Sequence, residues 1–323
     1  MDKILVTGCA GFIGFHTCKM LINNGYQVIG IDNINTYYDV KLKQDRIAIL
    51  EKYDNFYFKK LDFAYSKNGI KHFFEKHKPD KVIHLGAQAG VRYSLEYPQY
   101  YIDNNITGFL NIIENCIEYK VKHLLYASSS SVYGHETDMP FNEYQDCNKP
   151  ANFYAVTKKC NEGMAYANSK LYNLKSTGFR FFTVYGIWGR PDMALFKFTK
   201  NIIEGKPIDV YNNGDMERDF TYVDDIIEGI RLLMTAETLG NLRVFNIGCG
   251  KPSKLMDFVN EIELKLGKKA IINYMPMQLG DIKKTWCSTA RLETVTGYKP
   301  STTIKEGISK FVDWYLEYYN IKL

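Results

Sequence analysis

Short apolar runs alternate with longer amphipathic segments through the first half of the chain. Apolar, partly β-branched runs predict strands within residues 3–8, 26–32, 56–62, 81–86, 123–129 and 174–182. Apolar residues recur with helical spacing over residues 12–25, about 100–119 and 153–172. Short buried strands separated by helices indicate right-handed βαβ units and a parallel sheet with helices on both faces.

The regular alternation ends near residue 182. Loops with glycine and proline follow, and the predicted helix 223–234 and strand 244–248 stand among them. We therefore expect an α/β fold with a Rossmann-type doubly wound parallel sheet in residues 1–180 and a smaller C-terminal α/β domain in residues 181–323. Parts of residues 220–248 are expected to return to the first sheet.

Composition narrows the class of protein. The 323 residues are 46% hydrophobic and 24% charged, with a formal net charge of +5, as in a soluble globular protein. No dense basic block suggests nucleic-acid binding, whereas a mild positive charge suits a small anionic substrate. No apolar run reaches the roughly 20 residues of a membrane helix. Seven scattered cysteines without metal-ligand spacing, and no signal peptide, predict reduced thiols, a cytoplasmic location and no bound metal.

The stretch "TGCAGFIG" places Gly8, Gly11 and Gly14 between the first predicted strand and helix. In that context the first glycine permits a tight turn, the second lets backbone approach a pyrophosphate, and the third lets helix and strand pack closely. Phe12 and Ile13 open the helix, whose free N–H groups and positive dipole end would face the phosphates. These residues predict a dinucleotide site.

Two aspartates end neighbouring predicted strands. Asp32 lies eighteen residues past Gly14, where a carboxylate accepts hydrogen bonds from a ribose and repels a 2′-phosphate. The sequence therefore favours NAD over NADP. Asp62 ends the third strand; both contact with the adenine and the role of an ordinary loop aspartate remain open for it.

Tyr154 and Lys158 are four residues apart on the predicted helix 153–172, so their side chains share one face. We expect the ammonium to lower the phenol pKa from its reference value of about 10, which would make Tyr154 a general base and acid. Lys158 is also expected to hold the nicotinamide ribose.

With the serines of "YASSSSVYG", these residues resemble the extended short-chain dehydrogenase/reductases that act on nucleotide sugars. The resemblance implies that Ser129, twenty-five residues before Tyr154, is the catalytic serine, and that Ser130 and Ser131 line the pocket. Family 4,6-dehydratases carry acidic residues at those two places. Their absence here favours C4 oxidation and re-reduction over elimination.

Three longer stretches resemble the UDP-glucuronate 4-epimerase subgroup: residues 84–98, 179–214 and 218–226. The resemblance implies a cytoplasmic enzyme of polysaccharide biosynthesis that acts on a UDP sugar. It also implies a homodimer built through a four-helix bundle of the helices near 100–119 and 153–172. The candidate substrate-binding residues are Arg92, Ser130, Thr183, Arg190, Phe196, Tyr211, Arg218 and Asp281.

Specific roles follow for several of these residues. Arg218 resembles the arginine that binds the pyrophosphate, and Asp281 is placed to hold the uridine ribose. Arg190 and Thr183 are expected to bind the C6 carboxylate of the sugar. A phosphate remains an alternative partner for Arg190. Gly86 departs from the alanine common in the family, and "KTWCSTARL" lacks an aspartate that relatives often carry near Ser288.

Other functions remain open at this stage. They are a nucleotide-sugar 4,6-dehydratase with unusual acid and base residues, a 4-epimerase of a neutral sugar or a UDP-N-acetylhexosamine, and an NAD-binding regulator without catalysis. The intact Ser129, Tyr154 and Lys158 set argues against the regulator, because a pure sensor needs no general base.

Overall fold

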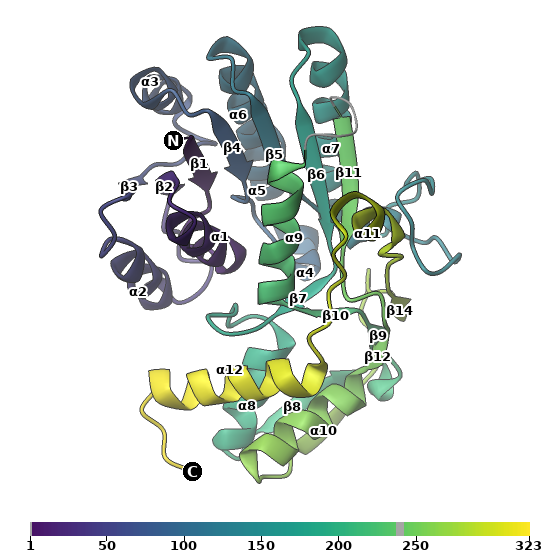
Figure 1. Cartoon of the computed structure of the whole chain (residues 1–323). Coiled ribbons are helices and arrows are strands. Elements are labelled where there is room, and N and C mark those ends of the chain that lie inside the picture. Colours follow the sequence, from purple (N-terminus) through teal and green to yellow (C-terminus); the bar gives the residue numbers. More distant parts are fainter. Residues whose placement is uncertain (1, 237–241) are drawn as a thin grey trace.

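A seven-stranded parallel sheet forms the centre of the larger lobe. The computed structural model describes residues 2–236 and 242–323 (Figure 1). In those residues the strand order of this sheet is β11-β6-β5-β4-β1-β2-β3. Its strands are β1 (Lys3–Thr7), β2 (Gln27–Asp32), β3 (Phe56–Lys60), β4 (Lys81–His84), β5 (His123–Ser129), β6 (Ser176–Phe181) and β11 (Leu242–Ile247).

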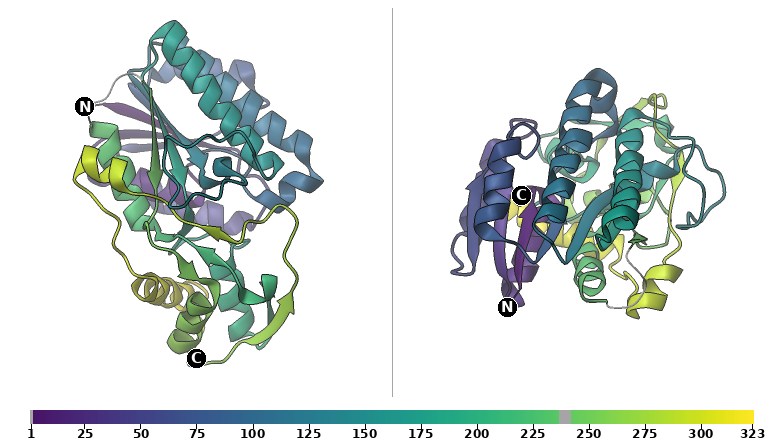
Figure 2. Two further views of the ribbon diagram at one scale, coloured as in Figure 1. Left: turned by 90° about the vertical axis from the view of Figure 1, so that its right-hand side faces the viewer. Right: turned by 90° about the horizontal axis from the view of Figure 1, so that it is seen from above.

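Helices cover both faces of this sheet (Figure 2). On one face α1 packs between α2 and α9, and on the other α6 packs between α3 and α7. Two separate apolar cores result, one under each helical layer. The helices are α1 (Phe12–Asn23), α2 (Val40–Leu50), α9 (Val223–Thr235), α3 (Lys67–His77), α6 (Gly108–Glu118) and α7 (Phe153–Tyr172).

The strand order reverses between β1 and β4. After β1 the chain adds β2 and β3 on one side, and then crosses back so that β4 pairs with the other edge of β1. In open α/β sheets, ligands bind in the crevice at the carboxyl ends of the strands where the order reverses. The topology thus marks the ends of β1 and β4 as the place for a site.

A smaller lobe of short strands and three helices lies beyond this carboxyl edge, in the lower part of Figure 1. Its strand pairs are β7 (Thr183–Tyr185) with β10 (Phe220–Tyr222), and β8 (Pro207–Tyr211) with β13 (Ile271–Met275). A third small sheet joins β12 (Ser253–Lys254), β9 (Glu217–Arg218) and β14 (Lys284–Thr285). The helices are α8 (Ala194–Ile203), α10 (Leu255–Leu266) and α12 (Ile304–Tyr318).

The strands and helices predicted from the sequence are present, and so is the predicted return of the chain to the first sheet. β11 pairs in parallel with β6 along its whole length, and α9 packs on α1. The predicted helix near 100–119 is composite: α5 (Pro98–Tyr101), a π-helical segment Ile102–Thr107, and α6. α11 (Ala290–Thr296) packs on α9 and β11, so a piece of the C-terminal region outside 220–248 also belongs to the larger lobe.

No helix of the described residues is long and apolar enough to cross a membrane.

Buried histidines couple the stability of this fold to pH. His123, at the start of β5, is 2% exposed and shares a hydrogen bond with the Thr177 hydroxyl at 2.8 Å. Burial lowers the pKa of His123 to about 3 and that of His16, on α1, to about 4, from an ordinary 6.5. The unfolded chain therefore binds protons below pH 6.5 that the native state does not, and native stability falls as the pH drops from 6.5 toward 4.

We predict that His123→Gln, which retains hydrogen-bonding atoms but does not titrate, reduces this pH dependence. The slope of the unfolding free energy against pH, between pH 4 and 6.5, should fall by about 1.4 kcal/mol per pH unit, the value for one proton. Urea denaturation at several pH values measures the slope. His135→Gln, at an exposed histidine, is the control, and an equal slope in the wild type and His123→Gln would contradict the assignment.

Candidate active site

One cavity of about 850 Å³ lies between the two lobes, at the carboxyl ends of β1, β4 and β5. It collects nearly all the residues that the sequence analysis singled out, from both halves of the chain. The predicted residues that line it are Gly8, Gly11, Phe12, Ile13, Gly14, Asp32, Arg92, Ser129, Ser130, Tyr154, Lys158, Thr183, Arg190, Tyr211, Arg218 and Asp281.

The glycine-rich loop forms one end of the cavity with bare backbone. Gly8 has φ +70°, and a Cβ there would lie 2.7 Å from the Cα of Gly86, which follows β4. A Cβ on Gly14 would lie 2.0 Å from the Gly8 carbonyl oxygen. Gly11 caps α1 without any side-chain hydrogen bond. The first amides of the helix, at Phe12 and Ile13, therefore have no intrahelical acceptor and are available to an anion.

Asp32 ends β2 beside this loop. One of its carboxylate oxygens accepts from the Ala10 amide at 3.1 Å and the other from the Ile34 amide at 2.8 Å. Burial raises the pKa of Asp32, while those amides and the charge of Lys43 lower it. Lys43 lines the same cavity, donates to the Asn35 carbonyl at 2.7 Å, and has a pKa lowered by burial to about 8. An acid and a lysine thus share the cofactor end.

Tyr154 and Lys158 lie on one face of α7 against the end of β5, as predicted. The Tyr154 amide donates a hydrogen bond to the Ser94 hydroxyl oxygen at 3.2 Å. The Lys158 ammonium donates to the Ala127 carbonyl at 2.8 Å and lies 6.0 Å from the centre of the Tyr154 ring. Ser129 is near enough to act on the Tyr154 phenol by hydrogen bonding.

The predicted effect of Lys158 on the phenol is wrong for the protein as it stands. Burial raises the pKa of Tyr154 above its ordinary value; the opposing effects come from Ser129 and from the guanidinium charge of Arg190. Burial also lowers the pKa of Lys158, to about 8. The spacing of four residues placed both groups on one face, but the ammonium is directed to the β5 carbonyl.

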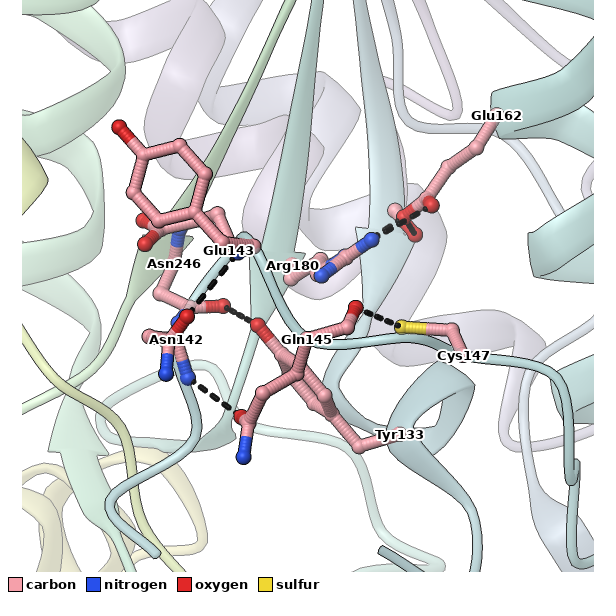
Figure 3. Close-up of polar contacts among 10 residues, drawn as sticks. Tyr133, Asn142, Glu143, Gln145, Cys147, Glu162, Arg180 and Asn246 are labelled. Carbon is pink, nitrogen blue, oxygen red and sulfur yellow. Dashed lines mark hydrogen bonds and ion pairs between the residues drawn. The ribbon is translucent and has the colours of Figure 1, made fainter. Parts of the chain in front are cut away.

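A buried ion pair supports the strand that carries the serines (Figure 3). Glu162, one turn beyond Lys158 on α7, accepts two hydrogen bonds from Arg180 of β6, both at 2.8 Å, and one from the Ser128 hydroxyl at 2.6 Å. Arg180 also lies over the Tyr133 ring, whose centre is 4.8 Å from the guanidinium carbon. The pair fixes α7 against β5 and β6, and so fixes Tyr154 relative to Ser129.

The same network reaches the loop after Gly134 (Figure 3). The Tyr133 hydroxyl donates to the Asn246 side chain at 2.7 Å, and Glu143 accepts from the Asn246 amide at 2.8 Å. The Tyr133 and Phe141 rings stack with centres 4.5 Å apart. The short 3-10 helix Ser130–Tyr133 is therefore fastened to β11 as well as to β5, and the serines that line the cavity are held on a rigid support.

Arg190 forms a second cluster of polar side chains, partly buried in the cavity wall. It donates to both oxygens of Asp192, at 2.9 and 2.5 Å, and Tyr37 donates to the same carboxylate at 3.2 Å. Burial acts to lower the pKa of Arg190, but the Asp192 charge outweighs it and raises the pKa. Thr183 begins β7 on this wall, and its amide donates a hydrogen bond to the Asp219 carbonyl at 3.0 Å.

Four predicted residues meet at the far end of the cavity. The Arg92 guanidinium lies 4.5 Å from the centre of the Tyr211 ring and 3.8 Å from an Asp281 oxygen. Arg218 donates to the backbone carbonyls of Glu217 and Lys283. Burial lowers the pKa of Arg218, and the nearby Asp281 charge opposes this. Two cations, an acid and an aromatic ring offer contacts to a phosphate, a ribose and a base.

Two predicted site residues lie outside the cavity lining. Asp62 accepts from the Ala64 and Tyr65 amides at 2.9 and 3.1 Å and from the Asn33 side chain at 2.9 Å, so its carboxylate serves the turn after β3. Its contact with an adenine stays a prediction. Phe196 is 5% exposed and packs edge-on against Phe311 and Tyr315 of α12 in the core of the smaller lobe. Phe198, two residues on, lines the cavity instead.

The departure at Gly86 has a packing cause. A Cβ on Gly86 would lie 2.6 Å from a ring carbon of Phe63, and a Cβ on Gly108 would meet the same ring at the same distance. Both glycines therefore make room for the Phe63 ring, which also lines the cavity. The space left by the missing side chain at Gly86 is filled by Phe63.

Sequence reasoning missed three charged residues around the site: Lys43, Arg46 and Glu162. All are buried, at 4%, 0% and 8% exposure. Lys43 and Arg46 fall on one face of α2 with the apolar Leu42, Ile47 and Leu50, so their helical spacing was a usable signal. Within the described ranges, no group of His, Cys, Asp and Glu could hold a metal ion.

Comparison with known proteins places these features in context. The model of the NAD dependent epimerase/dehydratase family matches residues 4–248. Protein CapI of Staphylococcus aureus is 50% identical, over 98% of this chain and 99% of its own length. A probable UDP-glucuronate 4-epimerase of Rhizobium meliloti (strain 1021) is 45% identical, over 98% of each. The crystal structure of a UDP-glucuronic acid 4-epimerase from Bacillus cereus, in complex with UDP-glucuronic acid and NAD, aligns with a TM-score of 0.92 at 32% identity, over 98% of this chain and 100% of that chain.

We predict that Glu162→Gln destabilises the protein by about 3–5 kcal/mol, the cost of leaving a buried partner charge unpaired. Because the loss comes from the orphaned Arg180, the double variant Glu162→Leu/Arg180→Met should recover much of the stability. Urea denaturation measures both. The exposed pair of Arg231 with Glu228 provides the control, since Glu228→Gln should change the unfolding free energy by less than about 1 kcal/mol. If Glu162→Gln and Glu228→Gln reduced the unfolding free energy equally, the role of the buried pair would be contradicted.

Proposed function

Because the chain belongs to the NAD dependent epimerase/dehydratase family, we propose that it uses NAD to interconvert UDP-glucuronate and UDP-galacturonate at C4 of the sugar. The observation that carries the proposal is one continuous cavity. It has the bare glycine-rich loop at one end, Tyr154 beside Ser129 in the middle, and the group of Arg92, Tyr211 and Asp281 at the other end. Its length and chemistry suit a dinucleotide and a nucleotide sugar that meet at Tyr154.

The residues present fit NAD. The uncapped amides at Phe12 and Ile13 would bind its pyrophosphate, and the glycine backbone leaves room for that contact. Asp32 would accept hydrogen bonds from the hydroxyls of the adenine ribose. Its negative charge would repel the 2′-phosphate of NADP. Lys158 would hold the nicotinamide ribose. When bound, oxidised NAD supplies the acceptor for the C4 hydride and later returns the same hydride.

Tyr154 is the proton acceptor in this reaction. As C4 loses its hydride, the C4 hydroxyl proton passes to the phenolate oxygen and C4 becomes a carbonyl carbon. Ser129 donates to the reacting oxygen, and the positive charge of Arg190 favours the phenolate. The keto sugar turns within the cavity, takes the hydride on its other face, and recovers a proton from Tyr154. No net oxidation results.

The carboxylate of the sugar requires a restraint. In the 4-keto form C6 is part of a β-keto acid, so the C5–C6 bond can break, releasing CO₂ while its electron pair moves toward the C4 oxygen. We assign the restraint to Arg190 and Thr183, which share the wall beside Tyr154. The Nη1 atom of Arg190 is not used by Asp192, which leaves it available to the substrate carboxylate.

A 4,6-dehydratase is less well supported. Elimination of water needs an acid and a base beside C5 and C6, and the places next to Ser129 hold the hydroxyls of Ser130 and Ser131. The Ser131 hydroxyl and amide are already hydrogen-bonded to the Ser129 hydroxyl, at 3.1 and 3.2 Å.

We also propose that the enzyme is cytoplasmic and supplies UDP-galacturonate for polysaccharide biosynthesis.

We predict that the purified protein converts UDP-glucuronate into UDP-galacturonate with no net change in NADH absorbance. Tyr154→Phe removes the proton acceptor, so turnover should fall by about 10²–10⁴-fold, the contribution of a general base. Chromatographic separation of the UDP sugars measures both, with NAD content as a check on folding. A wild type that forms only a UDP-pentose or a stable 4-keto-6-deoxy sugar would contradict the proposal.

We further propose that two copies associate through α6 and α7, which lie side by side on one face of the sheet. The outer faces of these helices expose apolar groups, including Leu110 on α6 and Val156 and Tyr166 on α7 at 39–55% exposure. Gly163 lies among them, and a Cβ there would meet no atom within 4 Å. Helices with small and apolar outer positions pack well into a four-helix bundle.

Gly163→Arg tests this dimer. The side chain has free space in the single chain, so the variant should fold, but it would obstruct a neighbouring helix. We expect the wild type to have twice the mass of one chain in light scattering and the variant to have the mass of one chain. Leu264→Arg, at an apolar residue 73% exposed on α10, should leave the mass unchanged. A monomeric wild type would contradict the proposal.

A further inference from the structure

The segment from Gly186 to Arg190 has a strained backbone. Trp188 has φ +56°, in the left-handed region that a bulky residue adopts only when its surroundings impose it, and Gly186 has φ +144°. Arg190 ends this segment, two residues after Trp188, and its carbonyl accepts a hydrogen bond from the Met193 amide at 3.1 Å. The position of Arg190 on the cavity wall therefore depends on whatever holds this segment in its unusual conformation.

Arg46 of α2 holds the segment from the other lobe. Its Nη2 donates to the Trp188 carbonyl at 2.6 Å and to the Gly189 carbonyl at 3.3 Å. Its Nη1 donates to the Ala10 carbonyl, in the glycine-rich loop, at 2.7 Å, and to the Tyr38 hydroxyl at 2.8 Å. One planar guanidinium thus joins the predicted pyrophosphate loop to the strained segment, whose Trp188 lies 142 residues after Arg46 in the chain.

The burial of this cation needs a reason. Arg46 is fully buried, and its four acceptors are all neutral oxygen atoms. Even with the charge of Asp32 nearby, a buried cation whose hydrogen bonds all go to neutral groups is costly compared with an apolar side chain of the same size. What the guanidinium provides is geometry, because its rigid fork can bind carbonyls of two different loops at once, as no apolar residue can.

His16 of α1 is a second anchor for the segment. Its Nε2 lies 2.9 Å from the Ile187 carbonyl, and burial lowers the pKa of His16 to about 4, so at neutral pH it is an uncharged donor to that oxygen. The Trp188 ring packs against Phe15 of α1 and Trp314 of α12, with ring centres 5.5 and 5.1 Å away. Both anchors come from helices that follow strands of the cofactor end.

We propose that Arg46 is a positioning residue that couples the glycine-rich loop to the part of the cavity wall that carries Arg190. It links the glycine-rich loop to the strained segment before Arg190, so that NAD bound at the loop fixes Arg190 in place for the sugar carboxylate. His16 supports the same segment. The role of Arg190 in this scheme rests on the proposed function, whereas the coupling between the two loops does not.

The coupling has a chemical consequence. If Arg190 is held in place, the C6 carboxylate of the keto sugar stays out of the alignment in which the C5–C6 bond breaks. If the segment loosens, a larger fraction of keto sugar loses CO₂: the electron pair of the C5–C6 bond moves toward the C4 oxygen, and C5 takes a proton. The resulting 4-keto pentose would then take back at C4 the hydride removed in the first step, which gives a UDP-pentose with no net oxidation. The ratio of UDP-pentose to UDP-galacturonate reports this fraction and is independent of how much enzyme is folded.

The first test uses hydrogen exchange and no substrate. In the wild type, NAD should slow amide exchange in residues 186–193, although the glycine-rich loop lies in the other lobe. In Arg46→Lys, which keeps the charge but ends in a single nitrogen, this NAD-dependent protection should be lost. His16→Leu should weaken the protection, and His16→Gln, which keeps an N–H donor, should restore it. Leu50→Ala, a buried residue at the end of the same helix, is the control for general destabilisation and should retain the protection.

The second test measures products. We expect Arg46→Lys to raise the ratio of UDP-pentose to UDP-galacturonate by about tenfold, the factor for a change near 1.4 kcal/mol from one lost charge-assisted hydrogen bond. Leu50→Ala should give the wild-type ratio. A folded Arg46→Lys that retains both NAD-dependent protection and the wild-type ratio would overturn the inference. A wild type with intact protection that forms no UDP-galacturonate would instead overturn the proposed function and leave the coupling standing.

Discussion

The site depends on the pairing of charges that the fold buries, fully or in part, along the carboxyl edge of its parallel sheet. Glu162 is paired with Arg180 in the interior, and Arg190 with Asp192 in the cavity wall, each through two hydrogen bonds to one carboxylate. In a medium of low polarity, a charge is tolerated only when such partners replace its water. These pairs are directional, so they also set the helices and loops that carry the chemistry within narrow limits.

The catalytic centre benefits from that rigidity. Because Glu162 holds α7 against β5, the phenol on α7 and the serine on β5 keep a fixed separation without substrate. The phenol lies in the cavity wall, and the protein around it raises its pKa by desolvation. A base placed in this way relies on neighbouring positive charge and on donated hydrogen bonds to ionise. Among the groups of this chain, the geometry gives that task to Arg190 and Ser129 more than to Lys158, whose ammonium serves a backbone carbonyl.

The two lobes contribute different binding groups to the cavity. The parallel sheet supplies backbone amides and a carboxylate at the reversal between β1 and β4, which is a consequence of topology. The smaller lobe supplies the aromatic ring, the acid and the cation that gather around Tyr211. Neither half forms the cavity alone, and Arg46 reaches from one to the other. A nucleotide sugar would therefore be in contact with residues from both lobes at once.

Local patterns in the sequence determined the elements, because apolar periodicity and glycine placement act over a few residues. They predicted the strands and helices of the sheet, the glycine-rich loop, the face shared by Tyr154 and Lys158, and the return of parts of residues 220–248 to the first sheet, which the structure shows as β11 beside β6. Only tertiary packing decided the direction in which each side chain points. Phe196 packs in the core of the smaller lobe, whereas Phe198 lines the cavity. The partner of a buried charge was likewise beyond the reach of the sequence, since Arg46 binds carbonyls 36 and 142 residues away. Contacts of that kind exist only once the chain has folded, because their energy depends on burial that no local pattern encodes.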